Sequence, residues 1–244
     1  MSKLYNIKNW TRQNLWAWMV ENAETQSKMQ AFRADQIFYW LYQQKVENFA
    51  EMINISQEIR KMLEEHFWIS SMKIAESQKS QDGSIKYRLL LEDGYSIECV
   101  FMPHTNHNTV CVSSQVGCGM GCDFCMTGTM GLVRNLKTAE IIDQILTVWS
   151  DLPDEQNLRN IVFMGMGEPL LNYNNVLKSI NLMVDDYSFG LSKRRITVST
   201  SGIVPGIDRL KKDNKVSLAI SLHASNDGLR DSIVPINRSY PILD

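Results

Sequence analysis

Three cysteines close together in the sequence, Cys118, Cys122 and Cys125, have the residue type and spacing to hold a metal centre. Deprotonated thiols are ligands for soft metals, and iron–sulfur clusters are bound through cysteine thiolates, normally four of them. Three local thiolates therefore leave one iron open to bind a cofactor or a substrate. Glycines let the backbone wrap tightly enough for the thiols to converge. This loop contains Gly117, Gly119 and Gly121.

A structural zinc site is the alternative that these residue types leave open. Closed zinc sites often use three cysteines and one histidine, and the candidates for the fourth ligand are His104, His107 and His223. Structural zinc loops usually pair two CxxC motifs, whereas the pattern here is a single CxxxCxxC. The spacing therefore favours an iron–sulfur cluster.

The composition predicts a folded globular protein without a membrane segment. The 244 residues are 44% hydrophobic, which is enough to bury a full core. No run of about 18 apolar residues occurs, and Met1–Asn6 has no basic segment followed by an apolar run, so we expect a cytoplasmic protein. Four of the five cysteines are crowded between Cys111 and Cys125, which argues for metal or redox chemistry over a disulfide framework.

The charge of the chain does not by itself predict a nucleic-acid partner. The formal net charge is -2, whereas proteins that bind polyanions usually carry a basic excess. Short basic runs are most often solvated helix ends or faces, and we interpret the runs in this sequence in that way. These runs are Arg134–Lys137, Lys193–Arg195 and Lys211–Lys212.

The first part of the chain has the apolar spacing of helices. From Asn9 to Phe67, apolar residues recur three to four positions apart, which predicts a small helical domain. Its aromatic residues could form a surface on which bases stack, but aromatics at helical spacing are more often core. They are Trp10, Trp16, Trp18, Phe38, Tyr39, Trp40 and Tyr42. Two β-rich runs follow, Ser84–Leu91 and Tyr95–Met102, around an Asp-Gly pair that favours a hairpin turn.

Beyond Thr109 the sequence alternates short β-branched runs with amphipathic helical segments. The expected strands are 109–115, 160–164, 195–199 and 216–222; a helix opens at Thr138 as N-cap, and further helices cover 173–184, 204–212 and 227–232. Repeating βα units imply an α/β fold with a parallel sheet, open or closed into a barrel, and ligand sites at the carboxyl ends of the strands. With four units visible, the sheet would keep an exposed edge, so we expect a truncated sequence or one completed by another chain.

The cysteine motif and its surroundings resemble a known family. CxxxCxxC after the first strand of a βα array resembles the signature of radical-SAM enzymes. The segments CVSSQVGC (111–118), FMGMGEP (163–169), STSG (199–202) and SLHA (221–224) resemble the RlmN/Cfr group of RNA adenine methyltransferases within that class. The resemblance implies a small N-terminal helical domain at 1–75, a connecting β-hairpin at 76–104 and a partial (βα) barrel of the radical-SAM type at 105–244.

The resemblance also implies two cofactors, a [4Fe-4S] cluster held by Cys118, Cys122 and Cys125, and S-adenosyl-L-methionine bound to its open iron. One electron from the cluster would split S-adenosylmethionine into methionine and a 5'-deoxyadenosyl radical. Residues matched to cofactor binding follow the expected strands. They are Gly167, Glu168, Ser199, Ser221, Leu222 and His223. Gly165 and Gly167 would let the backbone approach a ligand, and Glu168 would accept from a cationic amine.

In the resembled family, a cysteine near the C-terminal end is methylated, loses hydrogen to the radical and adds its methylene group to adenine. Cys111 matches a second cysteine that releases the product by forming a disulfide with this carrier, and Glu98 matches a carboxylate proposed as proton acceptor. From the residues alone, Cys111 is equally a buried small hydrophobe and Glu98 an outward-facing charge. No cysteine follows Cys125, so we expect this chain to bind cluster and cofactor without completing methyl transfer.

Three functions compete at this point. The first is methylation of adenine C2 in 23S rRNA, with tRNA as a further substrate of some family members and a reducing electron-transfer protein as partner. The second is C8 methylation of 23S rRNA, the branch associated with antibiotic resistance, which has the same motifs. A zinc-stabilised RNA-binding module is the third. In either enzyme an unpaired base must be splayed into the site.

Anaerobic purification followed by iron, sulfide and zinc analysis separates the enzymes from the zinc module. We expect a brown protein with about four irons that loses its colour in the Cys118→Ala variant, because a cluster thiolate is then removed. Stoichiometric zinc that persists after anaerobic cluster reconstitution would identify the binding module instead.

Overall fold

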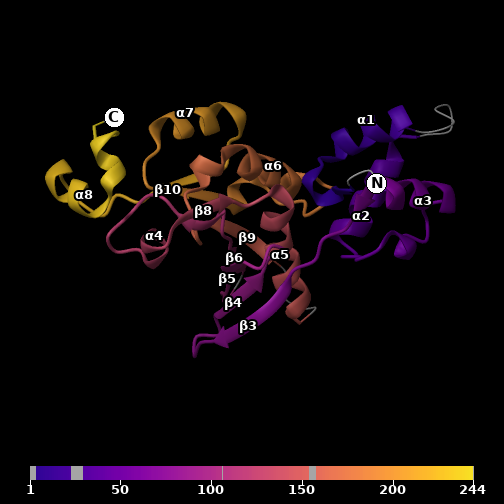
Figure 1. The fold of residues 1–244 in the computed structure, drawn as a ribbon, viewed down its shortest axis with the longest axis horizontal. Coiled ribbons are helices and arrows are strands. Elements are labelled where there is room, and N and C mark those ends of the chain that lie inside the picture. The colour runs from indigo at the N-terminus through magenta and orange to yellow at the C-terminus, as the bar shows by residue number, and fades with distance from the viewer. Residues whose placement is uncertain (1–3, 23–29, 106, 154–157, 244) are drawn as a thin grey trace.

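A seven-stranded mixed sheet runs through the middle of the molecule (Figure 1). The computed structural model describes residues 4–22, 30–105, 107–153 and 158–243. Residues 1–3, which belong to the segment Met1–Asn6 considered above, and Asp244 lie outside the described part. The strand order is β11-β10-β9-β6-β5-β4-β3. The strands are β3 (Lys73–Lys79), β4 (Ile85–Leu90), β5 (Ser96–Pro103), β6 (Asn108–Cys111), β9 (Leu158–Phe163), β10 (Ile196–Thr200) and β11 (Ser217–Ile220).

The half of the sheet from β6 to β11 is parallel, which confirms the fold class that the βα pattern predicts. The chain returns between strands through α5 (Thr138–Asp151), α6 (Tyr173–Val184) and α7 (Val204–Asp213). Side chains alternate along each strand, and those of Ile161, Phe163, Ile196 and Val198 share one apolar core with α5 and α6. The intervening residues face the other side. The sheet therefore has one helix-covered face and one open face, as a partial barrel requires.

The other half, β3 to β5, is antiparallel and extends downwards in Figure 1. The Asp-Gly pair predicts the β4–β5 hairpin, and Gly94 adopts the left-handed φ of +86° that its turn requires. The sequence does not predict β3, because all of its residues are exposed and show no alternation of burial. β5 pairs with β6, so in the structure the hairpin is continuous with the core sheet.

The first predicted parallel strand, 109–115, is interrupted in the structure. Only β6 joins the large sheet, whereas β7 (Gln115–Cys118) pairs with β8 (Gly131–Asn135) in a separate antiparallel sheet. Between them, the backbone N–H and C=O of Ser113 both bond to the side-chain amide of Gln144, at 2.7 and 3.0 Å. Backbone groups that would continue a sheet ladder are satisfied by α5 instead. The expectation of one continuous strand is therefore wrong.

The first part of the chain is helical, as predicted. It contains α1 (Arg12–Asn22), α2 (Phe32–Tyr42) and α3 (Gln57–His66), and its ends are joined by the parallel pair β1 (Tyr5–Asn6) and β2 (Phe67–Trp68). Phe38 and Tyr42 are fully buried, and Trp10, Trp18 and Trp40 pack against the same core. Most of the aromatic residues therefore stabilise the fold, as their helical spacing indicates.

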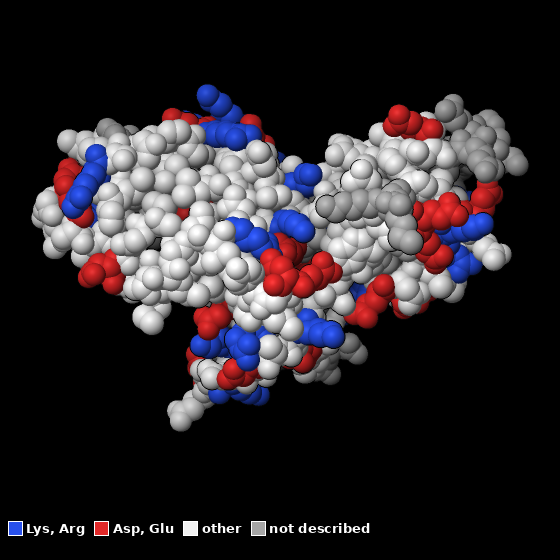
Figure 2. Space-filling model, in the orientation of Figure 1, with Lys and Arg blue, Asp and Glu red and all other residues white. Residues whose placement is uncertain are grey.

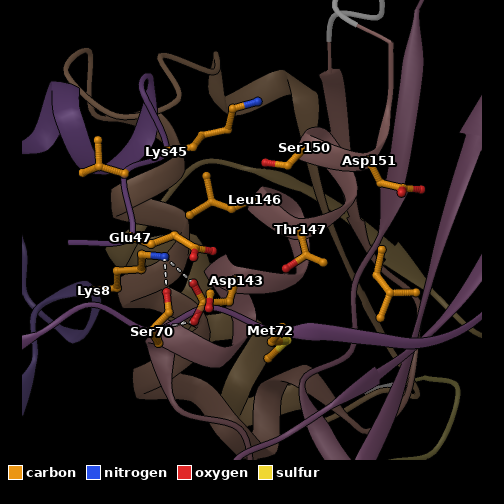
Figure 3. Close-up of a pocket in the computed structure, with 13 residues that line it drawn as sticks. Lys8, Lys45, Glu47, Ser70, Met72, Asp143, Leu146, Thr147, Ser150 and Asp151 are labelled. Carbon is orange, nitrogen blue, oxygen red and sulfur yellow. Dashed lines mark hydrogen bonds and ion pairs between the residues drawn. The ribbon is translucent and has the colours of Figure 1, made fainter. Parts of the chain in front are cut away.

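A buried ion pair fastens this helical part to α5 (Figure 3). The ammonium group of Lys8 lies 2.7 Å from the carboxylate of Asp143 and donates to the Ser70 carbonyl oxygen, also at 2.7 Å. The Ser70 hydroxyl donates to the same carboxylate. The two charged side chains are 5% and 3% exposed. Both charges therefore have protein partners at the buried interface between the helical part and α5, which we call the seam.

The start of α5 is also held from the helical part. The side-chain oxygen of Asn9 accepts from the N–H of Ala139 at 2.9 Å, which satisfies one of the free donors at the helix end. Thr138, predicted as the N-cap, is the first helical residue, and Lys137 occupies the N-cap position. The sequence pattern could not show this, because the group that caps the helix lies about 130 residues away.

A cavity of about 300 Å³ opens beside the Lys8–Asp143 pair (Figure 3). Side chains of both signs line it, including Lys45, Glu47 and Asp151, and no predicted site residue reaches it. The surface view in Figure 2 shows charged residues of both signs and a large uncharged area between α7 and α4. Within the described residues, no helix has the length and apolar character needed to cross a membrane.

Removal of one partner from the buried pair should destabilise the fold strongly. We expect Asp143→Ala to lower the free energy of unfolding by about 3–5 kcal/mol, because the Lys8 charge would remain buried without a counter-charge. The double variant Lys8→Met/Asp143→Leu should recover most of this loss, since an apolar pair of similar volume removes both desolvation costs. Denaturant unfolding of the three proteins measures both effects. A loss below about 1 kcal/mol for the single variant, the range of exposed pairs, would show that the pair is solvated.

Candidate functional site

The three clustered cysteines lie on the loop that leads from β7 into the short helix α4 (Met126–Thr129). Cys118 ends β7 and is buried, whereas Cys122 and Cys125 are partly exposed. Gly117 and Gly121 have positive φ angles of +73° and +64°, which bend the backbone on both sides of Cys118. A β-carbon at Gly117 would collide with the backbone of β8. Glycine is therefore required at the point where this loop folds back.

The thiols of the loop share one local space. Burial raises the pKa of Cys118, and the nearby Cys125 thiol adds to the shift. Burial likewise raises the pKa of Cys122, with contributions from Cys118 and Cys125. Such mutual effects require short distances between the groups. Among the described residues, no three Cys, His, Asp or Glu side chains are grouped so that they could already hold a metal ion.

The chemistry of these donors fits a [4Fe-4S] cluster with one open iron. Three soft thiols come from one loop, and such clusters bind through thiolates. The histidines considered for zinc lie elsewhere or have other contacts. His104 and His107 stack on each other in the loop between β5 and β6, with ring centroids 4.7 Å apart.

The cysteine loop lies against the carboxyl end of β11. The ring of Phe124, between the second and third cysteines, is 4.2 Å from the ring of His223, measured between centroids. The N–H of Asp123 donates to the carbonyl of Ile233, at the end of α8 (Asp227–Ile233), at 3.0 Å. The structure therefore brings the cysteines to the sheet edge where βα proteins place their ligand sites.

The segment after β9 is fixed to the residues just before the cysteine loop. The carbonyl of Met166 accepts from the N–H groups of Ser114 and Gln115, at 2.8 and 3.2 Å. The buried Gln115 side chain accepts from the N–H of Glu168 at 2.8 Å. These bonds hold the two segments side by side.

Gly165 and Gly167 are required by this close approach of backbone to backbone. A β-carbon on Gly165 would lie 2.8 Å from the Ser113 hydroxyl oxygen, and one on Gly167 would lie 2.5 Å from Cβ of Gln115. Gly167 also has a φ of +97°, which other residues rarely adopt. From the sequence, these glycines are expected to allow contact with a ligand; in the structure, the close approach of the segment from Val112 to Gln115 already requires them.

Glu168 is 3% exposed, and its carboxylate joins the ends of two strands. One oxygen accepts from the N–H of Leu170 at 3.1 Å, and the other accepts from the N–H and the hydroxyl of Ser201 at 2.8 and 2.9 Å. These partners are neutral donors. The negative charge of Glu168 also contributes to the raised pKa values of Cys118 and Cys122, so it lies near the cysteine loop.

The remaining residues matched to the cofactor lie at the ends of β10 and β11. Ser199 is the second-last residue of β10, where Ala219 is its partner on β11. Ser221 and Ser199 are partly exposed, and Leu222 and His223 are exposed. His223 has a positive φ of +58°, an unfavourable conformation for a residue other than glycine. All six predicted cofactor residues therefore lie along one edge, beside the cysteine loop.

Cys111 and Glu98 lie on the open face of the sheet. Val100 is opposite Cys111 in the register, and Glu98 is two residues before Val100, so all three side chains are on the same side. Burial raises the pKa of Cys111 to about 11, although a hydrogen bond from the backbone of Met164 acts in the opposite direction. The Glu98 side chain is 51% exposed and pairs with Lys86 at 3.1 Å. The structure brings the two residues to one face but shows no contact between them.

The five cysteines, all within the described residues, are free thiols. The disulfide implied for Cys111 by the resemblance is therefore not present in this chain. Cys99 is buried in the apolar core; burial raises its pKa well above the usual value, and the nearby Cys111 adds to the shift. Its neighbour Val100 faces the open side of the sheet, so Cys99 faces the helix-covered side.

Four buried polar residues of the site are not predicted from the sequence. Gln115 and Gln144 hold the turn after β6, Ser201 bonds to Glu168, and Arg230 of α8 bonds to backbone carbonyls after β10 and β11. Polar residues are usually exposed, so their types carry no signal of burial. Gln115 and Ser201 do lie inside the segments CVSSQVGC and STSG, and that position is the signal that could have found them.

Comparison with known proteins places two family models on the chain. The model described as "Radical SAM superfamily" matches residues 112–241, which contain the cysteine loop and the strand ends. The model described as "Ribosomal RNA large subunit methyltransferase N-terminal domain" matches residues 5–69, the helical part.

Individual relatives agree with these models. A dual-specificity RNA methyltransferase RlmN from Geobacter sulfurreducens is 51% identical over 86% of this chain, and one from Geotalea uraniireducens is 47% identical over 98%. The chain spans 58% and 67% of the lengths of these two relatives. A crystal structure of a radical SAM methyltransferase from Sphaerobacter thermophilus superimposes with a TM-score of 0.87 at 38% identity, covering 98% of this chain and 69% of that one.

The raised pKa of Cys111 predicts slow reaction with thiol reagents. At pH 8 roughly a thousandth of this thiol is ionised if its pKa is about 11, so alkylation by iodoacetamide should be slow and should accelerate about tenfold for each pH unit up to pH 10. Mass spectrometry of the labelled protein, with Cys111→Ser as control and circular dichroism at each pH, measures this. A rate that levels off near pH 8.5, as for an ordinary cysteine, would contradict the buried position.

Proposed function

The chain belongs to the radical SAM superfamily and, within it, to the RlmN family of RNA methyltransferases, and from this premise we propose that it acts in methylation of adenine C2 in 23S rRNA and tRNA. The observation that carries the proposal is the contact between the cysteine loop and the strand ends, made by Phe124 and His223. Members of the superfamily use a [4Fe-4S] cluster and S-adenosylmethionine. The cysteines matched to the cluster and the strand-end residues matched to S-adenosylmethionine come together at this contact.

Cys118, Cys122 and Cys125 would hold the cluster through their thiolates. When bound, the cluster and S-adenosylmethionine supply one-electron chemistry that protein side chains lack. The protein's part is to exclude water from the first thiol, which is buried, and to keep the other two accessible. Because burial raises the pKa of Cys118 and Cys122, metal binding would have to displace their protons.

Glu168 is the acceptor that we assign to the cationic amine of S-adenosylmethionine. Its carboxylate is held by neutral donors from Leu170 and Ser201, so its charge has no counter-charge in those contacts. Gly167 would offer its backbone beside it. Ser199, Ser221, Leu222 and His223 would contact the rest of the cofactor along the strand ends. These assignments rest on the shared edge of the sheet and on the family match.

Cys111 and Glu98 are assigned to the later steps. Both lie on the open face of the sheet, next to the ends of β5 and β6. Cys111 would be the thiol that releases the methylated product, and Glu98 would accept a proton. Lys86, which pairs with Glu98, would have to give up this contact or hold the carboxylate in place. The carrier cysteine of the family has no match after Cys125 in this sequence.

The choice of adenine C2 over C8 rests on the relatives, which are dual-specificity RNA methyltransferases. We place the activity in the cytoplasm, where RNA substrates and a reducing electron-transfer protein are present. Mass spectrometry of the modified nucleoside distinguishes 2-methyladenosine from the C8 product. Of the histidines considered for zinc, His104 and His107 stack on each other in the loop between β5 and β6, and His223 packs on Phe124 of the cysteine loop. The zinc alternative therefore rests on His223, and metal analysis of the purified protein decides it.

Reductive cleavage of S-adenosylmethionine tests the proposal on this chain. With a reconstituted cluster and dithionite, we expect 5'-deoxyadenosine and methionine but no methylated RNA, because the carrier cysteine is absent. Cys118→Ala should abolish cleavage. Glu168→Gln should reduce it at least about tenfold, which corresponds to 1.4 kcal/mol of lost stabilisation.

Glu64→Gln, on the exposed side of α3, is the matched control and should cleave like the unchanged protein. Products are quantified by liquid chromatography. Cleavage that survives Cys118→Ala would overturn the proposal. Methylated adenine formed by this chain alone would contradict the expectation that a carrier cysteine after Cys125 is needed for methyl transfer.

A further inference from the structure

The guanidinium of Arg230, in the middle of α8, is 3% exposed and is directed at backbone carbonyls. Its Nη2 donates to the carbonyl of Ser201 at 2.6 Å and to that of Ser221 at 3.3 Å. Its Nε donates to the carbonyl of Leu222 at 3.1 Å. These three carbonyls belong to the segments that follow β10 and β11. One side chain therefore bonds to the segments that follow two neighbouring strands.

The charge of Arg230 has no carboxylate in direct contact with it in these bonds. Its Nη1 donates to the side-chain oxygen of Asn237, which is itself buried, at 2.5 Å. The amide nitrogen of Asn237 then donates to the carboxylates of Asp227 and Asp231, at 3.0 and 2.7 Å. Arginine is rarely buried without a charged partner, because desolvation is costly. Four bonds to neutral acceptors offset that cost here.

Arg230 also completes a continuous network across the site. The N–H and hydroxyl of Ser201 donate to Glu168, while the carbonyl of the same residue accepts from Arg230. The helix that carries Arg230 ends at Ile233, whose carbonyl accepts from the cysteine loop at Asp123. The segments after β9, β10 and β11 and the cysteine loop are therefore linked through α8.

We propose that Arg230 is a positioning residue that holds the strand ends after β10 and β11 in the arrangement that binds S-adenosylmethionine. Two features of its surroundings support this role. The planar guanidinium fork can meet carbonyls from two strands at fixed angles, which a lysine ammonium on a flexible stem cannot do. Gly202 follows Ser201 with a φ of +112°, and a β-carbon there would lie 3.3 Å from Nη2 of Arg230. The backbone is thus shaped to receive this side chain.

The geometry also agrees with the charges of the ligand. Glu168 and Arg230 are buried charges of opposite sign on the two sides of Ser201, and they do not pair directly. The methionine end of S-adenosylmethionine is a zwitterion, with one ammonium and one carboxylate. Glu168 is the buried charge assigned to the ammonium, whereas Arg230 donates to protein acceptors and therefore acts through the backbone that it holds. This inference rests on the proposed function, since it names the same ligand.

Affinity for S-adenosylmethionine, measured by equilibrium dialysis on the anaerobically reconstituted chain, tests the proposal. Arg230→Lys keeps the charge but loses the fork, and Arg230→Gln loses the charge. We expect the dissociation constant to rise about tenfold or more in both, the equivalent of 1.4 kcal/mol. The increase in melting temperature that the ligand gives the unchanged protein should be lost in parallel. Iron content is measured in each sample.

Leu210→Ala is the control for lost stability. Leu210 is buried on α7, and its truncation lowers the melting temperature without removing a bond to any strand-end carbonyl. We expect its dissociation constant to stay within about twofold of the unchanged protein, the scatter of such measurements. An equal loss of affinity in Leu210→Ala, or unchanged affinity in Arg230→Lys, would overturn the proposal.

Asn237→Ala provides a second test if the Arg230 variants do not fold. It removes one support of the guanidinium and leaves the three backbone bonds in place, so affinity should fall by a smaller factor, about threefold. Unchanged affinity in this variant would count against the proposal. Absence of binding in the unchanged protein would instead refute the proposed function, so the two failures are distinguishable.

Discussion

The turn that the chain makes after Cys111 is the constraint on which the rest of the site depends. A continued strand would carry the cysteines past the edge of the sheet. Instead, Gln144 bonds to both backbone groups of Ser113, and Met166 accepts from the next two N–H groups. Buried backbone groups must find partners, so these bonds determine where the chain turns. The positions of the cysteine loop and of the segment after β9 both depend on these bonds at Ser113, Ser114 and Gln115.

Helix α5 connects this turn to the N-terminal helical part. Asp143 and Gln144 are consecutive, so their side chains point to different sides of the helix. Asp143 bonds to Lys8 in the seam, and Gln144 bonds to Ser113 in the turn. A buried ion pair adds little net stability compared with an apolar contact, but it requires one geometry. The Lys8–Asp143 pair therefore fixes the position of α5, and the bonds from Gln144 on α5 fix the position of the turn after Cys111.

Periodicity predicts those parts of the molecule in which burial alone decides the structure. The bounds of α6 and nearly those of α7 and α8 follow from apolar spacing, and the parallel order of β6, β9, β10 and β11 follows from the βα alternation. The interruption of the strand after β6 does not follow from periodicity, because it depends on Gln144 in a helix about 30 residues further along the chain. β3 is missed because its side chains are exposed; it is held by backbone pairing with β4 and by an exposed ion pair between Glu76 and Arg88.

The site shows the same division between local pattern and long-range contact. Cysteine spacing predicts the candidate metal ligands, because three thiols in one short loop lie in the same part of any fold. The strand-end residues are predictable only through the family motifs, since each lies in a different segment. Gln115, Gln144 and Arg230 bond to backbone atoms of other segments, and a backbone group has no signature in a sequence. Ser201 bonds to the side chains of Glu168 and Arg230, which lie in other segments as well. Their role becomes visible once the fold shows which carbonyl and N–H groups the sheet leaves without backbone partners. Buried backbone groups need hydrogen-bond partners, and at these positions polar side chains supply the bonds that neighbouring strands supply elsewhere in the sheet.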